Sequence, residues 1–254
     1  MNNYKLRKTG LIGKGTYSKV YTGEFLINKK KKCKVAFKIS KSFTDIEDKV
    51  KQLFTLQKQI SNWCPNIEYL LAIIKEPLKP VIRVLPIFGT KDLNKYIYDD
   101  IPSQQNLTIL AYCVRVQMIN ALYFLHNELK IVHTDIKLDN IMVDINTNHI
   151  WLIDLDEFKY ISNSRKDHWV QAVQYSHPNL MTDTLNWHPK YDNWSVSCVL
   201  YEIINREPLI KDEKFIIKGN KQDIIQWWHK TVTELYESKD LNLHLVGQDF
   251  RFLI

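Results

Sequence analysis

Residues 131–158 read IVHTDIKLDNIMVDINTNHIWLIDLDEF, and this stretch decides the fold. Within it Asp135, Lys137 and Asn140 share one polar loop, and Asp154 follows the second of two later apolar runs. Phosphoryl transfer needs a carboxylate that orients a hydroxyl, a cation for the moving phosphate and oxygen ligands for magnesium. The stretch supplies each of these groups at a fixed offset, so it predicts a loop that performs this chemistry.

Outward from this stretch, the expected elements change in kind along the chain. Period-two alternation predicts strands in the first third, whereas apolar residues at helical spacing dominate after Gly89. Strands first and helices second favour a small β-rich lobe followed by a helical lobe. The expected strands are three within 5–40, then 67–75, 80–87, 141–143 and 149–153; the expected helices are 46–60 (after a capping box at Thr44–Glu47), 91–99, 106–127, 190–205 and 221–237.

Composition narrows the class of protein. The chain has 254 residues with 45% hydrophobic content, enough to bury a large core as one domain or two lobes. It has no uninterrupted run of about 18 apolar residues, so no transmembrane helix is expected, and its N-terminus lacks the apolar core of a secretory signal. The four cysteines show no CxxC spacing and read as reduced thiols of a cytoplasmic or nuclear protein.

The net charge of +7 leaves two interpretations of the densest basic run, residues 28–34. A solvated hairpin turn between two strands is the favoured one. A nuclear-localisation signal or nucleic-acid patch is the alternative. Direct nucleic-acid binding is therefore not expected.

Two short motifs near the N-terminus fit the chemistry of residues 131–158. Residues 11–20 read LIGKGTYSKV, in which small residues let backbone N–H groups approach phosphate oxygens. Residues 35–38 read VAFK. There Ala36 is small, and Lys38 points to the face opposite Phe37 because side chains alternate along a strand.

Taken together, these motifs resemble those of protein kinases, from residue 10 to about 208. The resemblance implies an α+β, bilobal protein kinase-like fold with an antiparallel β-rich N-lobe over 1–88 and a mainly α-helical C-lobe over 89–254. The two lobes would form a single protein kinase domain, 1–254. ATP and Mg²⁺ are the implied cofactors.

The resemblance also assigns roles to individual residues. Asp135, Lys137 and Lys38 would be catalytic, and Asn140 and Asp154 would hold the metal. The backbone of Pro86 and Phe88 would face the edge of the adenine ring. The implied nucleotide-binding residues are Ile12, Gly13, Gly15, Val20, Ala36, Lys38, Leu85, Pro86, Phe88, Asp92, Asn140 and Asp154.

Thr134 and Asp156 differ from the residues that protein kinases usually have beside the catalytic aspartate and the metal-binding aspartate. Thr134 replaces an arginine that commonly binds a phosphorylated activation loop. We therefore predict that phosphorylation of that loop, at Ser162 or Ser164, is not the main switch. Asp156 replaces the glycine of Asp-Phe-Gly; it either adds a metal ligand or locks the loop in a local turn, and the turn is favoured.

The ion-pair partner of Lys38 is also in question. Kinases place a glutamate in the middle of the next helix, and here that position holds no acid. Glu47 lies near the helix N-terminus, where capping is its expected task. Gln57 lies on the apolar face at a suitable height, so a glutamine-paired or unpaired Lys38 remains an alternative.

Downstream residues separate two kinds of phosphotransferase. The loop Ile153–Asp156 is also similar to the metal loop of aminoglycoside and choline kinases. Residues 174–180, QYSHPNL, and 191–202, YDNWSVSCVLYE, instead resemble protein-kinase segments that support a peptide substrate, with Asp192 capping the catalytic-loop backbone. Two mismatches, Ala172 and Asn179, suggest a looser substrate platform completed by a partner.

Three functions follow, led by a serine/threonine protein kinase. Asp139 and Glu202 fall where kinases that act on basic proteins carry acids, so an Arg- or Lys-rich protein substrate and an activating protein partner are expected, without a membrane. A small-molecule phosphotransferase and a pseudokinase scaffold are the alternatives. The compact chain and its D-I-K-L-x-N loop are also similar to the late kinases of baculoviruses, which implies a viral protein in a host cell.

Overall fold

The computed structural model describes residues 4–14, 18–27, 31–40, 46–76, 79–161, 173–177 and 186–211, with positions 223, 226, 227, 230, 233, 234 and 237. The chain divides into two compact units. Unit 1 comprises residues 1–63 and 67–88, and unit 2 comprises residues 64–66 and 89–254. Several residues singled out from the sequence lie outside the described ones: Gly15, 28–30 of the basic run, Thr44 and Asp45 of the capping box, Ser162, Ser164, Ala172, Asn179 and most of 221–237.

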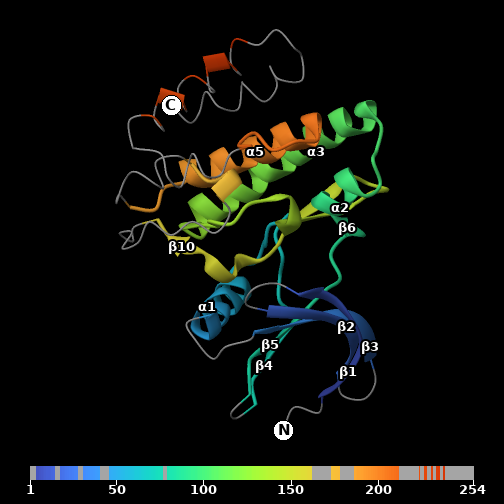
Figure 1. Cartoon of the computed structure of the whole chain (residues 1–254). Coiled ribbons are helices and arrows are strands. Elements are labelled where there is room, and N and C mark those ends of the chain that lie inside the picture. Colours follow the sequence, from blue (N-terminus) through green and yellow to red (C-terminus); the bar gives the residue numbers. More distant parts are fainter. Residues whose placement is uncertain are drawn as a thin grey trace. The chain divides into compact units, whose positions relative to one another are not determined.

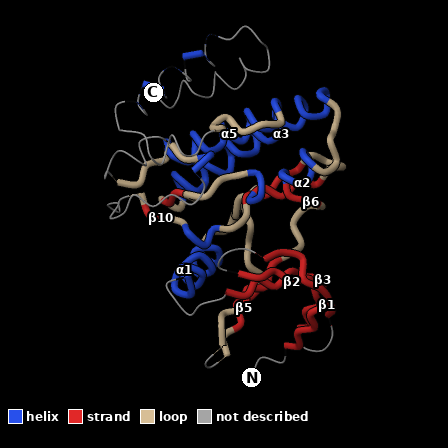
Figure 2. Tube along the Cα trace, in the orientation of Figure 1, coloured by secondary structure: helices blue, strands red, loops and turns tan. Residues whose placement is uncertain are grey.

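Unit 1 is built on a five-stranded antiparallel sheet (Figures 1 and 2). Its strand order is β1-β2-β3-β5-β4, and helix α1 (Ile46–Gln59) belongs to the same unit. The three strands predicted within 5–40 are confirmed. The strands are β1 (Tyr4–Lys14), β2 (Ser18–Ile27), β3 (Lys31–Ser40), β4 (Ala72–Ile74) and β5 (Ile82–Leu85).

The strand predicted at 67–75 is too long. Only Ala72–Ile74 pairs with β5, although the Leu71 N–H still donates to the Val84 carbonyl at 2.7 Å. Just before this point the backbone of Leu70 is bonded at both its N–H and its carbonyl by the Gln57 side chain. A side chain from α1 thus occupies the groups that a longer strand would have paired.

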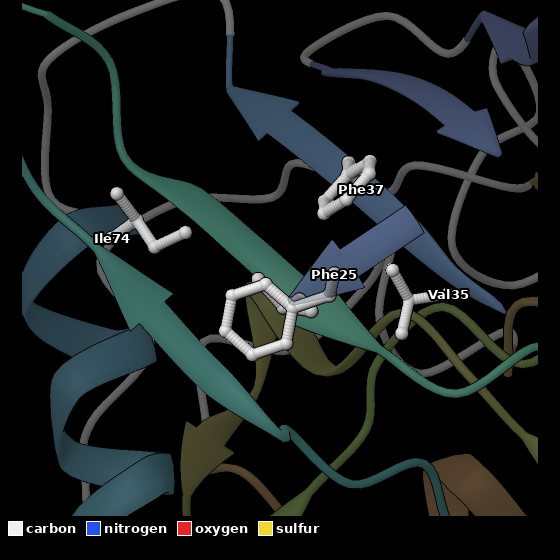
Figure 3. Close-up of a cluster of buried hydrophobic side chains, with 5 residues drawn as sticks. Phe25, Val35, Phe37 and Ile74 are labelled. Carbon is white, nitrogen blue, oxygen red and sulfur yellow. The ribbon is translucent and has the colours of Figure 1, made fainter. Parts of the chain in front are cut away.

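The apolar core of unit 1 lies on one face of the sheet. Phe25, Val35, Phe37, Ile74 and Val84 are buried and pack together (Figure 3). Val35 and Phe37 of β3 both join this core because alternate residues of a strand share a face. Lys38 lies on the other face of the sheet. The prediction that Lys38 points away from Phe37 agrees with this core.

Unit 2 combines helices with two small sheets (Figure 2). One sheet has the order β6-β8-β9 and the other pairs β7 with β10. The predicted hairpin and the helix at 190–205 are confirmed, whereas 91–99 begins as a short strand. The elements are β6 (Lys91–Asp92), β7 (Ile131–Val132), β8 (Ile141–Asp144), β9 (His149–Leu152), β10 (Lys159–Tyr160), α2 (Leu93–Tyr98), α3 (Gln104–Tyr123), α5 (Lys190–Asn205), the π-helix η1 (Phe124–Glu128) and the 3₁₀ turns η2 (Leu138–Asn140), η3 (Leu155–Glu157) and η4 (Val173–Tyr175).

Helices α3 and α5 lie side by side and form the core of unit 2 (Figure 1). The Ser103 hydroxyl caps α3 by accepting from the Asn106 N–H, and the Gln104 amide donates to the Ile204 carbonyl at 3.0 Å. α3 continues into η1 at Phe124, so the predicted helix over 106–127 is confirmed with a change of helical type at its end.

Helix α3 and the π-helix η1 form one long apolar segment, although no transmembrane helix was expected from the sequence. By length and composition alone, Gln104–Glu128 is long and apolar enough to cross a bilayer. A core helix passes the same test, and the buried face of this one packs against α5 inside unit 2. While unit 2 is folded, that face is unavailable to lipid.

Candidate active site

The loop at residues 133–140, called the catalytic loop below after its predicted role, is held by a carboxylate from α5. Asp192 is 1% exposed, and its two oxygens accept hydrogen bonds from the backbone N–H groups of His133 at 2.7 Å and Thr134 at 3.0 Å. A third bond joins it to the ring of His126 at 2.8 Å. Burial alone would raise the pKa of Asp192, but these hydrogen bonds and nearby imidazoles lower it below the usual value.

His133 connects the catalytic loop to the metal loop. Its Nδ1 accepts from the Asp135 N–H at 3.3 Å, so Nε2 carries the proton and donates to the Ile153 carbonyl at 3.0 Å. Ile153 immediately precedes Asp154, and the Ile153 N–H donates to the Asn140 carbonyl at 2.9 Å. The loop around Asp135 and the segment before Asp154 are thus joined at two points of unit 2.

Asp135, Lys137 and Asn140 come together in the arrangement that the sequence predicted. The Lys137 ammonium donates to both Asp135 oxygens, at 3.0 and 2.8 Å. The Asn140 amide nitrogen donates to the Asp135 carbonyl at 2.7 Å and to its Oδ2 at 2.9 Å. The carboxylate is only 7% exposed, and the bonds from Lys137 and Asn140 fix its orientation. It can therefore accept a proton or align a hydroxyl.

Asn140 and Asp154 fit a magnesium ion. Because the Asn140 nitrogen donates to Asp135, its amide oxygen is the atom left for a cation. Asp154 follows β9 with a left-handed backbone, φ 71° and ψ 51°, directly before η3. The described residues contain no cluster of three His, Cys, Asp or Glu side chains for a metal. Mg²⁺ is commonly bound by one or two protein oxygen atoms together with phosphate oxygens of the substrate. Asn140 and Asp154 therefore fit an Mg²⁺ ion that arrives with a nucleotide.

Asp156 lies in the 3₁₀ turn η3 and is 8% exposed. A local turn is the conformation that the sequence favoured for it. Its neighbour Leu155 is fully buried and fills the apolar position of the motif.

Thr134 ties the catalytic loop to the segment after the metal loop. Its hydroxyl donates to the Glu157 carbonyl at 3.2 Å, and its own φ is 72°, a strained value for a β-branched residue. On either side of this bond the backbone pairs as well, since Val132 of β7 lies opposite Lys159 of β10. The Thr134 hydroxyl bond and the pairing of β7 with β10 thus join the two segments at the position where protein kinases commonly have an arginine.

In unit 1, one face of the sheet collects four of the expected nucleotide residues. Ala36 lies opposite Leu85 in the ladder, and Lys38 lies opposite Val20 on one side. Residues 36 and 38 share a face, so all four side chains project from the face opposite the apolar core. Lys38 is 7% exposed, which places its ammonium at the end of a mostly buried stem.

The remaining nucleotide residues described in unit 1 lie on β1 and after β5. Gly13 pairs with Val20 just after a break in register between β1 and β2, and Ile12 beside it is exposed. After β5, Phe88 is buried and meets the Tyr69 ring edge-on at 5.6 Å. Pro86 lies just after β5, half-buried.

Both residues considered as partners of Lys38 are engaged elsewhere. Glu47 accepts from Lys51 at 2.9 Å and from Lys75, and these two bonds lower its pKa. Gln57 bridges to the backbone of Leu70, with distances of 2.9 and 2.8 Å. These contacts fix α1 to the segment before β4.

The acids expected to meet a basic substrate differ sharply in their surroundings. Glu202 is 5% exposed, and its oxygens accept from the hydroxyls of Tyr98 at 2.8 Å and Tyr175 at 2.6 Å. Burial and the bond to Glu202 raise the pKa of both tyrosines. Asp139, in contrast, is exposed and accepts only a neutral amide bond, from Asn94 at 3.1 Å, among the contacts described for it.

Asp92 also has a structural task. It caps α2 by accepting from the Lys95 N–H at 2.9 Å, and it pairs with the Lys95 ammonium at 2.7 Å. Of Asp92, Asp139 and Glu202, Asp139 is therefore the one whose carboxylate faces solvent.

Sequence reasoning missed two residues beside the site. His126, within the apolar run of α3 and η1, is buried against Asp192. Arg83, within the apolar strand β5, is 3% exposed and lies directly opposite Lys38 in the ladder. A polar or basic residue inside a run of apolar ones was the signal available in both cases.

The chain matches known proteins along most of its length. Residues 6–245 match the family model described as protein kinase domain. A probable cyclin-dependent serine/threonine-protein kinase of Dictyostelium discoideum is 30% identical over 211 residues, 80% of this chain and 14% of the relative. Serine/threonine-protein kinase ssn3 of Aspergillus niger is 26% identical over 226 residues, 84% of this chain and 51% of the relative.

A solved structure supports the fold. A chain of the CAK complex from Chaetomium thermophilum, bound to ATP-γ-S, superposes with a TM-score of 0.67 at 24% identity, over 89% of this chain and 68% of the other. The chain spans about half or less of the length of the two curated relatives. Their names point to a slime mould and a fungus and give no support to the expected viral origin.

Proposed function

The chain belongs to the protein kinase family, and from this premise we propose that it transfers the γ-phosphate of ATP to serine or threonine hydroxyls of proteins. The observation that carries the proposal is the arrangement around Asp135, whose carboxylate is bonded by Lys137 and Asn140 on a loop fixed by Asp192. The relatives named above as serine/threonine-protein kinases support the same class of substrate.

Each residue of the loop then has a chemical task. Asp135 accepts a hydrogen bond from the substrate hydroxyl and aligns it for attack. Lys137, already beside this carboxylate, offsets negative charge on the phosphate in transfer. Asn140 and Asp154 would hold Mg²⁺, which when bound neutralises charge on the triphosphate. Lys38, on the sheet of unit 1, would hold the α- and β-phosphates.

A basic protein is the proposed substrate, and Asp139 supports this. Its exposed carboxylate can pair with an arginine or lysine near the phosphorylated residue. Glu202 supports it less, because it is buried and already bonded by two tyrosines. We expect Asp139→Asn to weaken a basic preference in a peptide library and Glu202→Gln to act mainly through stability.

Control without a loop phosphate is the second part of the proposal. The bond from the Thr134 hydroxyl to Glu157 and the pairing of β7 with β10 hold the start of the loop in place of an arginine–phosphate contact. An activating protein partner is proposed as well. It is supported by the complex in which the similar solved chain occurs.

Phosphate transfer to a basic protein tests the activity directly. With radioactive ATP and histone as acceptor, wild-type protein should label the histone, and Asp135→Asn should lower the rate by about two to four orders of magnitude while nucleotide binding is kept. The exposed Asp48→Asn is the matched control and should not change the rate. Labelling of choline or an aminoglycoside in place of histone would favour the small-molecule alternative, and binding of ATP with no transfer would favour a scaffold.

Thr134 variants test the control mechanism. Thr134→Val keeps the shape but removes the hydroxyl, so kcat should fall about three- to tenfold, the equivalent of one hydrogen bond, with the KM for ATP little changed. Thr134→Ser restores the donor and should restore kcat.

The double variant Ser162→Ala, Ser164→Ala is the companion measurement. It should retain wild-type activity, as should phosphatase-treated protein. Loss of activity in either would show that loop phosphate controls this kinase after all.

A further inference from the structure

Helix α3 carries a continuous apolar stripe on the face turned away from α5. Five large side chains on this face are exposed, by 48, 61, 42, 56 and 62% in chain order. They recur at intervals of three and four residues: Ile109, Tyr112, Val116, Ile119 and Tyr123. Alternating intervals of three and four define the seam of a coiled coil, which a second helix normally covers. These five residues are called the α3 seam below.

The seam is distinct from the face that stabilises unit 2. The buried residues of α3, such as Leu110, Val114 and Met118, supply the core beside α5. The seam residues fall between these positions on the helix and remain 42–62% exposed. Isolated exposed apolar residues are ordinary, but a row of five along one helix marks an interaction surface for a protein or a membrane.

The lack of charged residues along the α3 seam favours a second copy of the chain as its binding partner. Within Gln104–Tyr123 the only charged residue is Arg115, which is half-buried at the margin of the seam. The flanking positions Thr108, Cys113 and Asn120 are neutral. Two identical α3 helices can therefore approach without a row of like charges, whereas a seam selective for a different partner normally carries charges on its flanks.

The exposed area of the α3 seam is the size expected for a weak, reversible dimer interface. Residues 109 to 123 span about 21 Å of helix at roughly 1.5 Å per residue. Large side chains expose about 150–250 Å² when free, so the fractions above leave on the order of 500 Å² on each copy. Two copies would bury about 1,000 Å², at the lower limit for a specific interface. We propose that the chain forms a homodimer in which the α3 seams of two copies pack against each other.

Sedimentation equilibrium of the full chain tests this. Between about 1 and 100 µM the wild-type protein should pass reversibly from monomer to dimer. Val116→Glu and Ile119→Glu place a charge at the centre of the seam and should raise the dissociation constant at least about tenfold. Asn106→Glu makes the same kind of change on an exposed position of α3 away from the seam and should leave it unchanged.

The remaining outcomes also decide the matter. A wild-type protein that stays monomeric over the whole range overturns the proposal, and capture of a different protein by such a monomer would assign the seam to that partner. A dimer that persists in folded Val116→Glu and Ile119→Glu overturns it too, because another face would then hold the copies together. Circular dichroism establishes that the variants are folded, and Ile119→Ser is a milder second variant.

Discussion

At the scale of single residues, Asp192 links stability to the catalytic loop. Its buried carboxylate accepts from two backbone N–H groups of the loop and from the His126 ring. Breaking a buried charged network leaves donors without an acceptor and is among the costliest single changes in a folded protein. The loop that carries Asp135 therefore depends on a buried residue of α5.

The pH dependence of Asp192→Asn follows from the direction of its pKa shift. The folded-state pKa lies below the ordinary 3.8, so the contribution to stability is present above about pH 4 and is lost as the pH falls through the folded-state value. At pH 7 the variant should lose about 2–4 kcal/mol of unfolding free energy. The gap from wild type should narrow as the pH is lowered below 3.8 in urea titrations. A gap that stays constant down to pH 2 would contradict this.

At the scale of elements, the sheet of unit 1 depends on a glycine in β2. A Cβ on Gly23 would lie 2.3 Å from the Arg7 carbonyl oxygen and 2.5 Å from a carbon of the Phe37 ring. Neither can move without disturbing the β1–β2 ladder or the apolar core. Gly23→Ala should therefore destabilise the protein by about 1–3 kcal/mol in thermal or urea unfolding.

Gly10→Ala is the matched control on the neighbouring strand. Its Cβ would meet the Thr22 hydroxyl at 3.6 Å, an ordinary contact. The free energy of unfolding should change by less than about 1 kcal/mol. Equal effects of the two substitutions would mean that the close approach at Gly23 does not limit the sheet.

The sequence predicts these elements where a local pattern decides them. Alternation along 5–40 and the D-x-K-x-x-N spacing around Asp135 needed no information from elsewhere, and the first was confirmed. The early end of the 67–75 strand depends on the Gln57 side chain, and the burial of Glu202 depends on tyrosines 27 and 104 residues away. Such contacts have no local signature. The roles of the site residues stay predictions.

At the scale of the whole molecule, nucleotide binding should stabilise the chain. A ligand that binds only the folded state adds about 2.7 kcal/mol at a concentration one hundred times its Kd, which raises the Tm by several degrees for a chain of this length. With ATP present, adding Mg²⁺ should increase the shift and EDTA should reverse that increase. Asp154→Asn should lose the increase, and the exposed Asp99→Asn should keep it. An unchanged response of Asp154→Asn would remove this residue from the metal site.

The three bonds of Asp192 also bear on how the protein is made. They join positions 58, 59 and 66 residues apart, and closing such long loops is slow compared with forming local helices. During translation the catalytic loop emerges well before α5. Until α5 docks, the loop's N–H groups at 133 and 134 lack this acceptor. We therefore expect a nascent chain to order its catalytic loop only after α5 has been synthesised.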